Sequence, residues 1–271
     1  MGTQFFPNYS SMSAETPNIH LYILTPRTVA THHKETESQV SNDNLLTKEN
    51  AWKLVNVFFS MMGIRLDAGK ILIVWLPLIA LSLCLGNLAV EHEFLVEFAI
   101  ACWAFYYVGM TLLLGTGIKR WMIQKFGEER AWLYFQMILG LMFFNVGTGF
   151  YVAALHLQGA FSLSPTLMWA LVIPMFIIGF GIKYWATLVI GIDVYYYKDL
   201  FHEKTHGEWT EAGPYKWLGN PMYGIGYLHS YCLGIMLGSE WGLVYAAICH
   251  LSIFVFYRIA EKPFIVKTYL Q

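Results

Sequence analysis

The fold is decided by residues 223–257, which read YGIGYLHSYCLGIMLGSEWGLVYAAICHLSIFVFY. Two apolar runs, 223–237 and 241–257, are separated only by Gly238, Ser239 and Glu240. At ~1.5 Å per helical residue, each run is shorter than the ~30 Å hydrocarbon core of a bilayer unless flanking residues extend it. The spacing therefore predicts a tight helical hairpin whose two ends return to one membrane surface.

The rest of the chain has the composition of a membrane protein. Hydrophobic residues make up 56% of the 271 residues, charged residues make up 13%, and the mean hydropathy is +0.47. A spanning helix needs ~20 apolar residues, and four further runs come close to or exceed that length: 71–90, 98–114, 132–155 and 167–190. We expect an all-α, polytopic membrane protein with about six transmembrane helices, the last two forming the hairpin.

The first part of the chain differs from this pattern. Residues 1–50 are rich in Ser, Thr, Asn, Glu and His, and contain too little apolar material to fold alone. We predict a flexible cytosolic tail over residues 1–50 and an integral-membrane domain over residues 51–271. Where they join, Trp52, Val55, Phe58 and Met62 recur with roughly helical spacing, which predicts an interfacial helix.

The distribution of basic residues predicts the orientation. Lys and Arg precede the first span, follow the last one, and occupy two of the loops. The opposite loops contain no Lys or Arg, and their only charged residues are Glu. The positive-inside rule then places both termini and both large loops in the cytosol. The net charge of −1 and the lack of a basic run argue against nucleic-acid binding. The four cysteines have no CxxC spacing, and we expect no metal site.

Polar motifs flank the hairpin. The sequence GPYKWLGNPMY occupies 213–223 and RIAEKPF occupies 258–264, so the hairpin would bring the two together. Pro221 restricts Asn220 to an extended conformation and ends the preceding helix, which we expect to leave backbone groups for a ligand or water. Because Gly226 has no side chain, a ligand or another segment of the chain is able to approach the start of the next helix closely.

These motifs carry a family resemblance. Residues 214–269 resemble the C-terminal part of the membrane phospholipid N-methyltransferases, and the nearest resemblance is to one unit of the larger fungal phosphatidylethanolamine N-methyltransferases. Weaker similarity extends to residues 103–121 and 195–201. The wider superfamily includes the isoprenylcysteine carboxyl methyltransferases and sterol reductases, which carry related proline loops.

The resemblance implies methylation of the ethanolamine headgroup of phospholipids, towards phosphatidylcholine, with S-adenosylmethionine as cosubstrate. It implies a cosubstrate site that includes Tyr215, Asn220, Pro221, Met222, Tyr223, Gly226, Tyr227, Arg258, Glu261, Gly179 and Gly181. Enzymes of this family from animals and some fungi have two adjacent Glu before Pro-Phe. This chain has Ala260, Glu261 and Lys262 there, so only Glu261 inherits the role of holding the cosubstrate's amine.

Physical requirements give the same residues independent support. The cosubstrate needs an anion for its amine, a cation for its carboxylate, and aromatic surfaces for its adenine and sulfonium. Glu261 and Arg258 provide the two charges, and the tyrosines of the loop provide the aromatic surfaces.

Candidate substrate residues lie in or near the fourth span. Asp193 and Asp199 lie where an ammonium headgroup would arrive, and we expect one of them to receive the amine and help remove its proton. His229 is interpreted as a pocket residue and a third candidate catalytic residue, or else as a hydrogen-bond partner between helices. Lys183 is placed to reach a lipid phosphate, and Lys198 is a second candidate for substrate binding.

Other interpretations stay open at this point. The chain could be an isoprenylcysteine carboxyl methyltransferase, a sterol-reductase-like enzyme, or a non-catalytic scaffold or transporter. Gly179 and Gly181 could serve helix packing, and Tyr195, Tyr196 and Tyr197 favour an aromatic belt at the membrane boundary. The sequence leaves open the oligomeric state and the organelle, which would be the endoplasmic reticulum in a eukaryote or the inner membrane in a bacterium.

Overall fold

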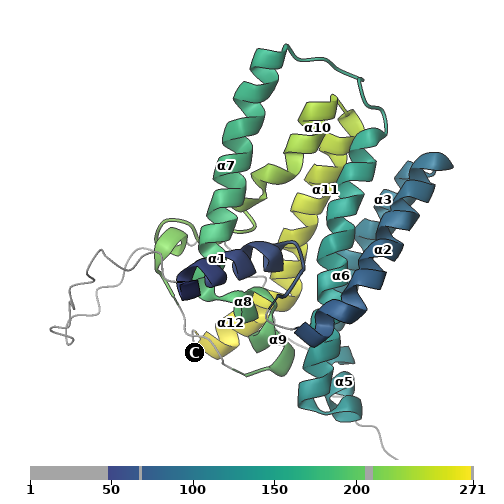
Figure 1. The fold of residues 1–271 in the computed structure, drawn as a ribbon. Helices are drawn as coiled ribbons and strands as arrows, with labels where there is room; N and C mark the ends of the chain where they lie inside the picture. Colours follow the sequence, from purple (N-terminus) through teal and green to yellow (C-terminus); the bar gives the residue numbers. More distant parts are fainter. Residues whose placement is uncertain (1–47, 67–68, 205–209, 270–271) are drawn as a thin grey trace, which may run out of the picture. The chain divides into compact units, whose positions relative to one another are not determined.

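The computed structural model describes residues 48–66, 69–204 and 210–269. The predicted tail over residues 1–50 lies almost entirely outside them, so the tail stays a prediction. Residues 45–271 form one compact unit, and every regular element among the described residues is helical (Figure 1). The predicted all-α fold is confirmed.

The long apolar helices follow the predicted spans closely. Four are long and apolar enough to cross a membrane, at 95–115, 128–155, 165–190 and 240–269, and two shorter apolar segments lie at 75–91 and 225–237. The main elements of these segments are α2 (Gly69–Glu91), α3 (Leu95–Trp103), α4 (Gly109–Gly115), α6 (Glu128–Leu155), α7 (Pro165–Ile190), α10 (Cys232–Leu237), α11 (Glu240–Phe256) and α12 (Lys262–Tyr269).

Two spans contain a wide π-helical turn. Residues Ala104–Val108 (η2) join α3 to α4, and residues Tyr257–Glu261 (η5) join α11 to α12. Each π turn is continuous with the α-helices on both sides. Such turns are rare, and they occur frequently at functional sites.

The C-terminal hairpin is less even than expected. Its first arm is the 3-10 helix η4 (Ile225–Tyr231) followed by α10, while its second arm continues for 30 residues to Tyr269. The apolar run ends at Tyr257, but the helix does not, because polar side chains there leave the backbone hydrogen bonds in place. Flanking residues thus extend the second arm beyond its apolar run to the length of a full span.

The hairpin turn itself is tight. Gly238 has a φ of +59°, and a Cβ there would lie 2.1 Å from the Phe161 carbonyl oxygen. The Ser239 hydroxyl then accepts a hydrogen bond from the Gly242 amide at 3.0 Å, which caps α11.

The first helix, α1 (Lys48–Met61), lies against α7 and also contacts Tyr196, the residue that follows α8 (Ile192–Tyr195). The Tyr184 hydroxyl donates to the Leu54 carbonyl at 2.9 Å, and the Tyr196 hydroxyl donates to the Ser60 carbonyl at 3.0 Å. The apolar face of α1 stays exposed through Trp52, Val55 and Phe58, as an interfacial helix requires.

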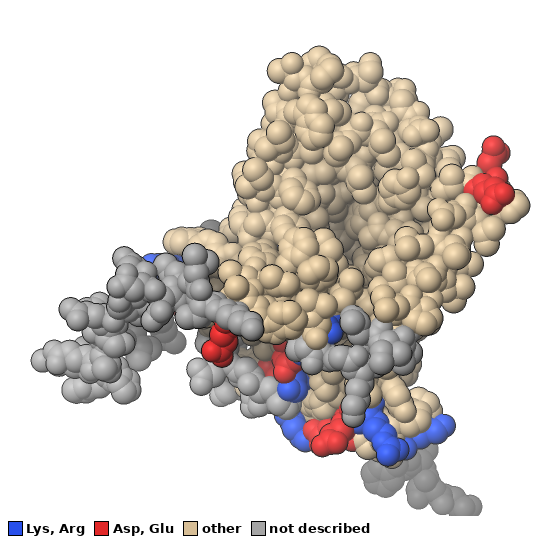
Figure 2. Space-filling view, in the orientation of Figure 1, with Lys and Arg blue, Asp and Glu red and all other residues tan. Residues whose placement is uncertain are grey.

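Charged side chains gather at one end of the helices. Figure 2 shows Lys and Arg together with acidic side chains at this end, and a separate acidic patch elsewhere on the same face. Salt bridges join α5 (Ile118–Phe126), α6 and the residues that follow α9 (Lys198–His202): Lys119 lies 3.0 Å from Glu203, and Lys204 lies 2.7 Å from Glu128. The basic loops of the sequence thus meet at one end of the fold.

Candidate active site

The proline loop and the end of the second hairpin arm meet in space. The Tyr223 hydroxyl donates a hydrogen bond to Oε2 of Glu261 at 2.9 Å, across 38 residues of sequence. The rings of Tyr223 and Tyr257 also contact each other, with centroids 6.1 Å apart. The predicted convergence of the two polar motifs is confirmed.

The Glu261 carboxylate is surrounded by tyrosines. The Tyr223 hydroxyl also bonds to the Tyr197 hydroxyl at 2.9 Å. Burial raises the pKa of Tyr223 and Tyr215, and the negative charge of Glu261 raises both further. Burial and the neighbouring Tyr106 raise the pKa of Tyr197, with Glu261 adding to the shift. All three hydroxyls therefore stay protonated at neutral pH and are able to donate hydrogen bonds.

No cation accompanies this carboxylate in the part of the chain that is described. Arg258 is three residues away along the wide turn, but its side chain is exposed and forms no ion pair with Glu261. The two charges expected to act as a pair therefore face different surroundings, because the helix points Arg258 outward and Glu261 towards the tyrosines.

The proline loop satisfies its own backbone. The Asn220 side-chain oxygen accepts from the Tyr223 amide at 3.2 Å, and the Pro221 carbonyl accepts from the Gly226 amide at 2.8 Å. The expectation that Pro221 leaves backbone groups open to a ligand was wrong at these positions, since the Asn220 side chain and the tight turn supply the partners. The loop is therefore a preformed wall.

A second group of aromatic residues, not predicted from the sequence, comes from the π turn η2. Tyr106 and Tyr107 are buried edge to face with centroids 4.7 Å apart, and the Tyr107 hydroxyl bonds to the Tyr227 hydroxyl. Two adjacent tyrosines within an otherwise apolar span were the available signal.

His250 has a structural role in this group. Its ring stacks on Tyr227 at 4.8 Å, and its Nε2 donates to the Tyr223 carbonyl at 2.8 Å. His250 thereby fixes both loop tyrosines.

The three consecutive tyrosines before α9 also differ from expectation. Tyr195, Tyr196 and Tyr197 are 6%, 0% and 8% exposed, so they do not form an aromatic belt. The chain packs against α6 and α7 here, and the Tyr195 ring stacks on the Phe143 ring of α6 with centroids 5.4 Å apart. They belong to the protein core near the candidate site.

Asp193 is held by two cations. Arg65 lies 2.9 Å from one carboxylate oxygen, and Lys198 lies 2.8 Å from the other. Partial burial raises the pKa of Asp193, but the hydrogen bonds from Lys198 and Arg65 outweigh it and hold the pKa below its ordinary value. Asp193 and Lys198 were both expected to contact substrate, and in the structure they form an ion pair with each other.

Asp199 is buried on α9 and accepts a hydrogen bond from the Tyr269 hydroxyl. This contact joins α9 to the end of α12 and makes Asp199 part of the same junction.

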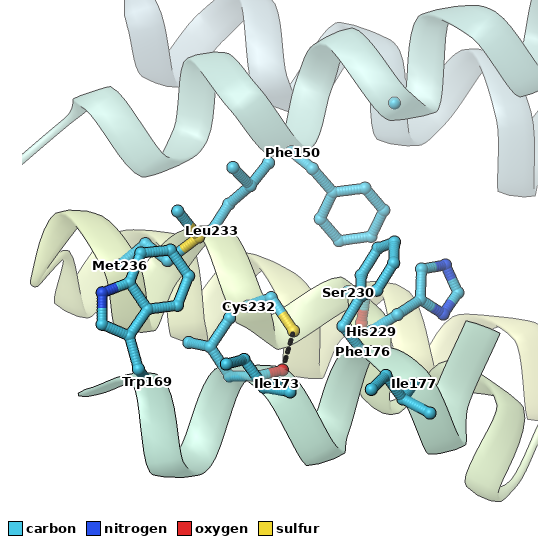
Figure 3. Close-up of a pocket in the computed structure, with 12 residues that line it drawn as sticks. Phe150, Trp169, Ile173, Phe176, Ile177, His229, Ser230, Cys232, Leu233 and Met236 are labelled. Atoms are coloured by element: carbon cyan, nitrogen blue, oxygen red, sulfur yellow. Dashed lines mark hydrogen bonds between the residues drawn. The ribbon is translucent and has the colours of Figure 1, made fainter. Parts of the chain in front are cut away.

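His229 and Lys183 both approach Gly226, and a Cβ on Gly226 would lie 3.3 Å from the Lys183 Cβ. His229 Nδ1 is 2.7 Å from the Gly226 carbonyl, so Nδ1 carries the proton in the neutral ring and Nε2 is left as an acceptor. Lys183 Nζ is 6.0 Å from the centre of the Tyr195 ring. The imidazole also borders a cavity of about 570 Å³ between the helices (Figure 3).

The two glycines of α7 have different environments. A Cβ at Gly179 would lie 2.6 Å from the His229 backbone nitrogen, so Gly179 allows α7 and η4 to pack closely. Gly181 is exposed and faces open space.

Comparisons with known proteins agree with these motifs. Residues 167–271 match the sequence model of the family described as phospholipid methyltransferase. The C-terminal part of the chain is similar to the phospholipid methyltransferases. The matched region contains the proline loop, His229 and Glu261, and the resemblance predicted from the sequence is confirmed for it.

Similar curated proteins include fungal enzymes. The phosphatidylethanolamine N-methyltransferase of Botryotinia fuckeliana is 28% identical over 146 residues, which cover 52% of this chain and 15% of that protein. The enzyme of the same name from Komagataella phaffii is 29% identical over 147 residues, 52% of this chain and 16% of that protein. The chain therefore spans only a small part of the length of these phospholipid methyltransferases. No solved structure matches the chain.

Proposed function

We propose that this chain binds S-adenosylmethionine beside Glu261 and promotes methylation of the amine of an ethanolamine phospholipid. The observation that carries the proposal is the Glu261 carboxylate, which accepts a hydrogen bond from the Tyr223 hydroxyl and has no ion-pair partner within the described ranges. A carboxylate withdrawn from water without a cation is costly, and a bound ammonium group offsets that cost.

The residues present fit the cosubstrate in two respects. Glu261 suits an ammonium group, and the tyrosines around it offer the electron-rich faces that attract a cation. Bound there, S-adenosylmethionine would supply a methyl group activated by a sulfonium. Asn220, Pro221, Met222 and Gly226 would form the wall beside it, with Tyr215, Tyr223 and Tyr227 as aromatic surfaces.

Fewer observations support the other proposed cosubstrate contacts, those of Arg258 and of the two α7 glycines. Arg258 would reach the cosubstrate's carboxylate only from the exposed side of the helix. Gly181 remains open for ligand contact, whereas the space beside Gly179 is filled by the His229 backbone.

Among the three candidate acid–base residues, we favour His229. An ethanolamine nitrogen attacks only as the neutral amine, so one proton must leave the ammonium group, and the free Nε2 of His229 is able to accept it. Asp193 is already paired with two cations, and Asp199 is bonded to Tyr269. Lys183 would hold the lipid phosphate, and a phosphate between Lys183 and His229 would relieve their repulsion when the imidazole is protonated.

The proposed orientation follows the basic loops. We place both termini on the cytosolic side, with substrate drawn from the leaflet on that side. In a eukaryotic cell this suits the endoplasmic reticulum, and in a bacterium the inner membrane.

The test is expression of the chain in cells that lack lipid methylation, followed by mass spectrometry of their lipids. Mono-, di- or trimethylated ethanolamine lipids should appear with the wild type, and their number shows which steps are performed. His229→Gln should reduce their formation by about 100-fold, the lower range for loss of a general base. Absence of all three products from cells that contain the folded wild-type protein would reject the proposal.

A further inference from the structure

The cavity beside His229 lies between three helical segments. Its walls come from Gly147 and Phe150 of α6, from α7 between Trp169 and Ile177, and from the η4–α10 segment up to Met236. Its volume of about 570 Å³ falls within the range of small-molecule sites. Figure 3 shows Trp169 and Met236 at one end and the His229 imidazole at the other.

The lining is apolar over most of its length. Ser230 donates its hydroxyl to the Tyr227 carbonyl at 2.8 Å, which leaves His229 as the polar feature of the wall. Ordered water is disfavoured along the apolar part of the cavity, because water there lacks hydrogen-bond partners. The chemistry of the wall therefore suits a hydrocarbon.

The cavity reaches the surface of the protein along α7. Ile173, Phe176 and Ile177 line it and are still 50%, 50% and 63% exposed. All three belong to a helix long and apolar enough to cross a membrane. The opening therefore faces the lipid of the bilayer, and a lipid tail can enter without passing through water.

The dimensions match one leaflet. From Lys183 to Ile173, midway along the α7 wall of the cavity, is ten residues of α7, or ~15 Å at the helical rise. This equals half of the ~30 Å hydrocarbon thickness, the depth that an acyl chain of one leaflet reaches, and Trp169 lies about one helical turn deeper. A phosphate at Lys183 would thus set the headgroup beside His229 and the tail in the cavity.

We propose that this cavity holds an acyl chain of the phospholipid substrate, which enters between α7 and α10 and aligns its headgroup with His229. The proposal rests on the proposed function for the identity of the lipid. Chain binding in the cavity would position the amine, so the protein would discriminate between lipids by tail length as well as by headgroup.

Gly147 offers a direct test. It lines the cavity, and a Cβ built on it meets nothing within 4 Å, so Gly147→Phe should fill the space without a backbone clash. Ile178→Phe is the matched control, because Ile178 is 47% exposed on α7 and does not line the cavity.

The purified full chain would be assayed in micelles with phosphatidylethanolamines carrying either two six-carbon or two sixteen-carbon chains. Gly147→Phe should lower kcat/KM for the long-chain lipid by about 10-fold or more, equivalent to losing contact with two or so methylene groups. The short-chain lipid should change by less than about 3-fold, and Ile178→Phe should resemble the wild type with both. Equal activity of Gly147→Phe and wild type, or an equal loss on both lipids, would overturn the proposal.

A labelling experiment separates this inference from the proposed function. A long-chain phosphatidylethanolamine with a diazirine at the chain end should label peptides containing Trp169 or Met236, and Gly147→Phe should abolish that labelling. Labelling confined to other helices would refute the cavity assignment even if methylation occurs. Labelling of these peptides without methylation by the wild type would support the cavity and reject the proposed function.

Discussion

Asp193 and Glu261 are carboxylates near the same group of tyrosines, yet their surroundings are opposite. Asp193 has a cation on each oxygen, Arg65 at 2.9 Å and Lys198 at 2.8 Å. Arg65 follows α1 and lies 128 residues from Asp193 in the sequence. Glu261 has a tyrosine hydroxyl and, within the described residues, no cation. The comparison indicates that a carboxylate paired on both oxygens links segments of the folded chain, whereas a carboxylate without a cation is available to bind a ligand.

The largest expected effect separates the two residues. Glu261→Gln keeps the shape of the side chain but removes its charge, so affinity for S-adenosylmethionine should fall by about 10- to 100-fold, as for loss of a hydrogen bond to a charged group. Titration calorimetry on the purified variant measures this. Asp193→Asn should bind within about 3-fold of wild type, and equal losses in the two variants would remove the distinction.

A smaller effect should follow from Tyr223→Phe. This change deletes the hydroxyl that links Glu261 to Tyr197 while it retains the ring. Affinity for S-adenosylmethionine should fall by about 3- to 10-fold, the value of one hydrogen bond of ordinary strength. Tyr245→Phe is a control, since its hydroxyl bonds to the Ala99 carbonyl elsewhere in the core. A larger loss in the control would show that the effect reflects general destabilisation.

Asp193→Asn should affect stability instead of ligand affinity. The two ion pairs are partly exposed, so we expect a loss of about 0.2–1 kcal/mol at neutral pH. Because the folded-state pKa of Asp193 is lowered, its contribution is present above the ordinary carboxyl pKa of about 3.9 and is lost as pH falls through the folded value. Thermal unfolding in detergent should show the gap between wild type and variant closing below pH 4 or so. A gap that persists in acid would assign the stabilisation to packing.

The smallest effect is expected for Arg258→Ala. Its side chain is exposed and forms no ion pair with Glu261, so affinity for S-adenosylmethionine should fall by less than about 3-fold. The same calorimetric titration applies, with Lys262→Ala as a neighbouring exposed control. A loss as large as that of Glu261→Gln would show that Arg258 turns inward when ligand binds.

The sequence predicted the spans well because apolar length is a local property that the bilayer thickness constrains directly. It also predicted that Tyr223 and Glu261 approach each other, since a hairpin returns its ends to one side. The length of the second arm stayed open because hydropathy marks where apolar residues stop, and not where backbone hydrogen bonds stop.

The errors at the site share a cause. Arg65 lies 128 residues from Asp193 in the sequence, and no local sequence pattern predicts that the two side chains form an ion pair. The burial of Tyr195 to Tyr197 depends on α6 packing over them, and the role of Tyr106 and Tyr107 depends on a π turn that hydropathy does not register. Such long-range pairings arise only after the helices have packed.

The two π turns make the geometry of these helices depend on residue count. Each wide turn corresponds to one additional residue in an α-helix, and one residue advances the helix phase by ~100°. The wide turn absorbs that extra residue, so α11 and α12 keep nearly the phase of one continuous helix. Deleting a residue within 257–261 would leave an ordinary α-helical turn, in which α12 keeps its direction but the side chains of the turn itself, Glu261 included, point elsewhere.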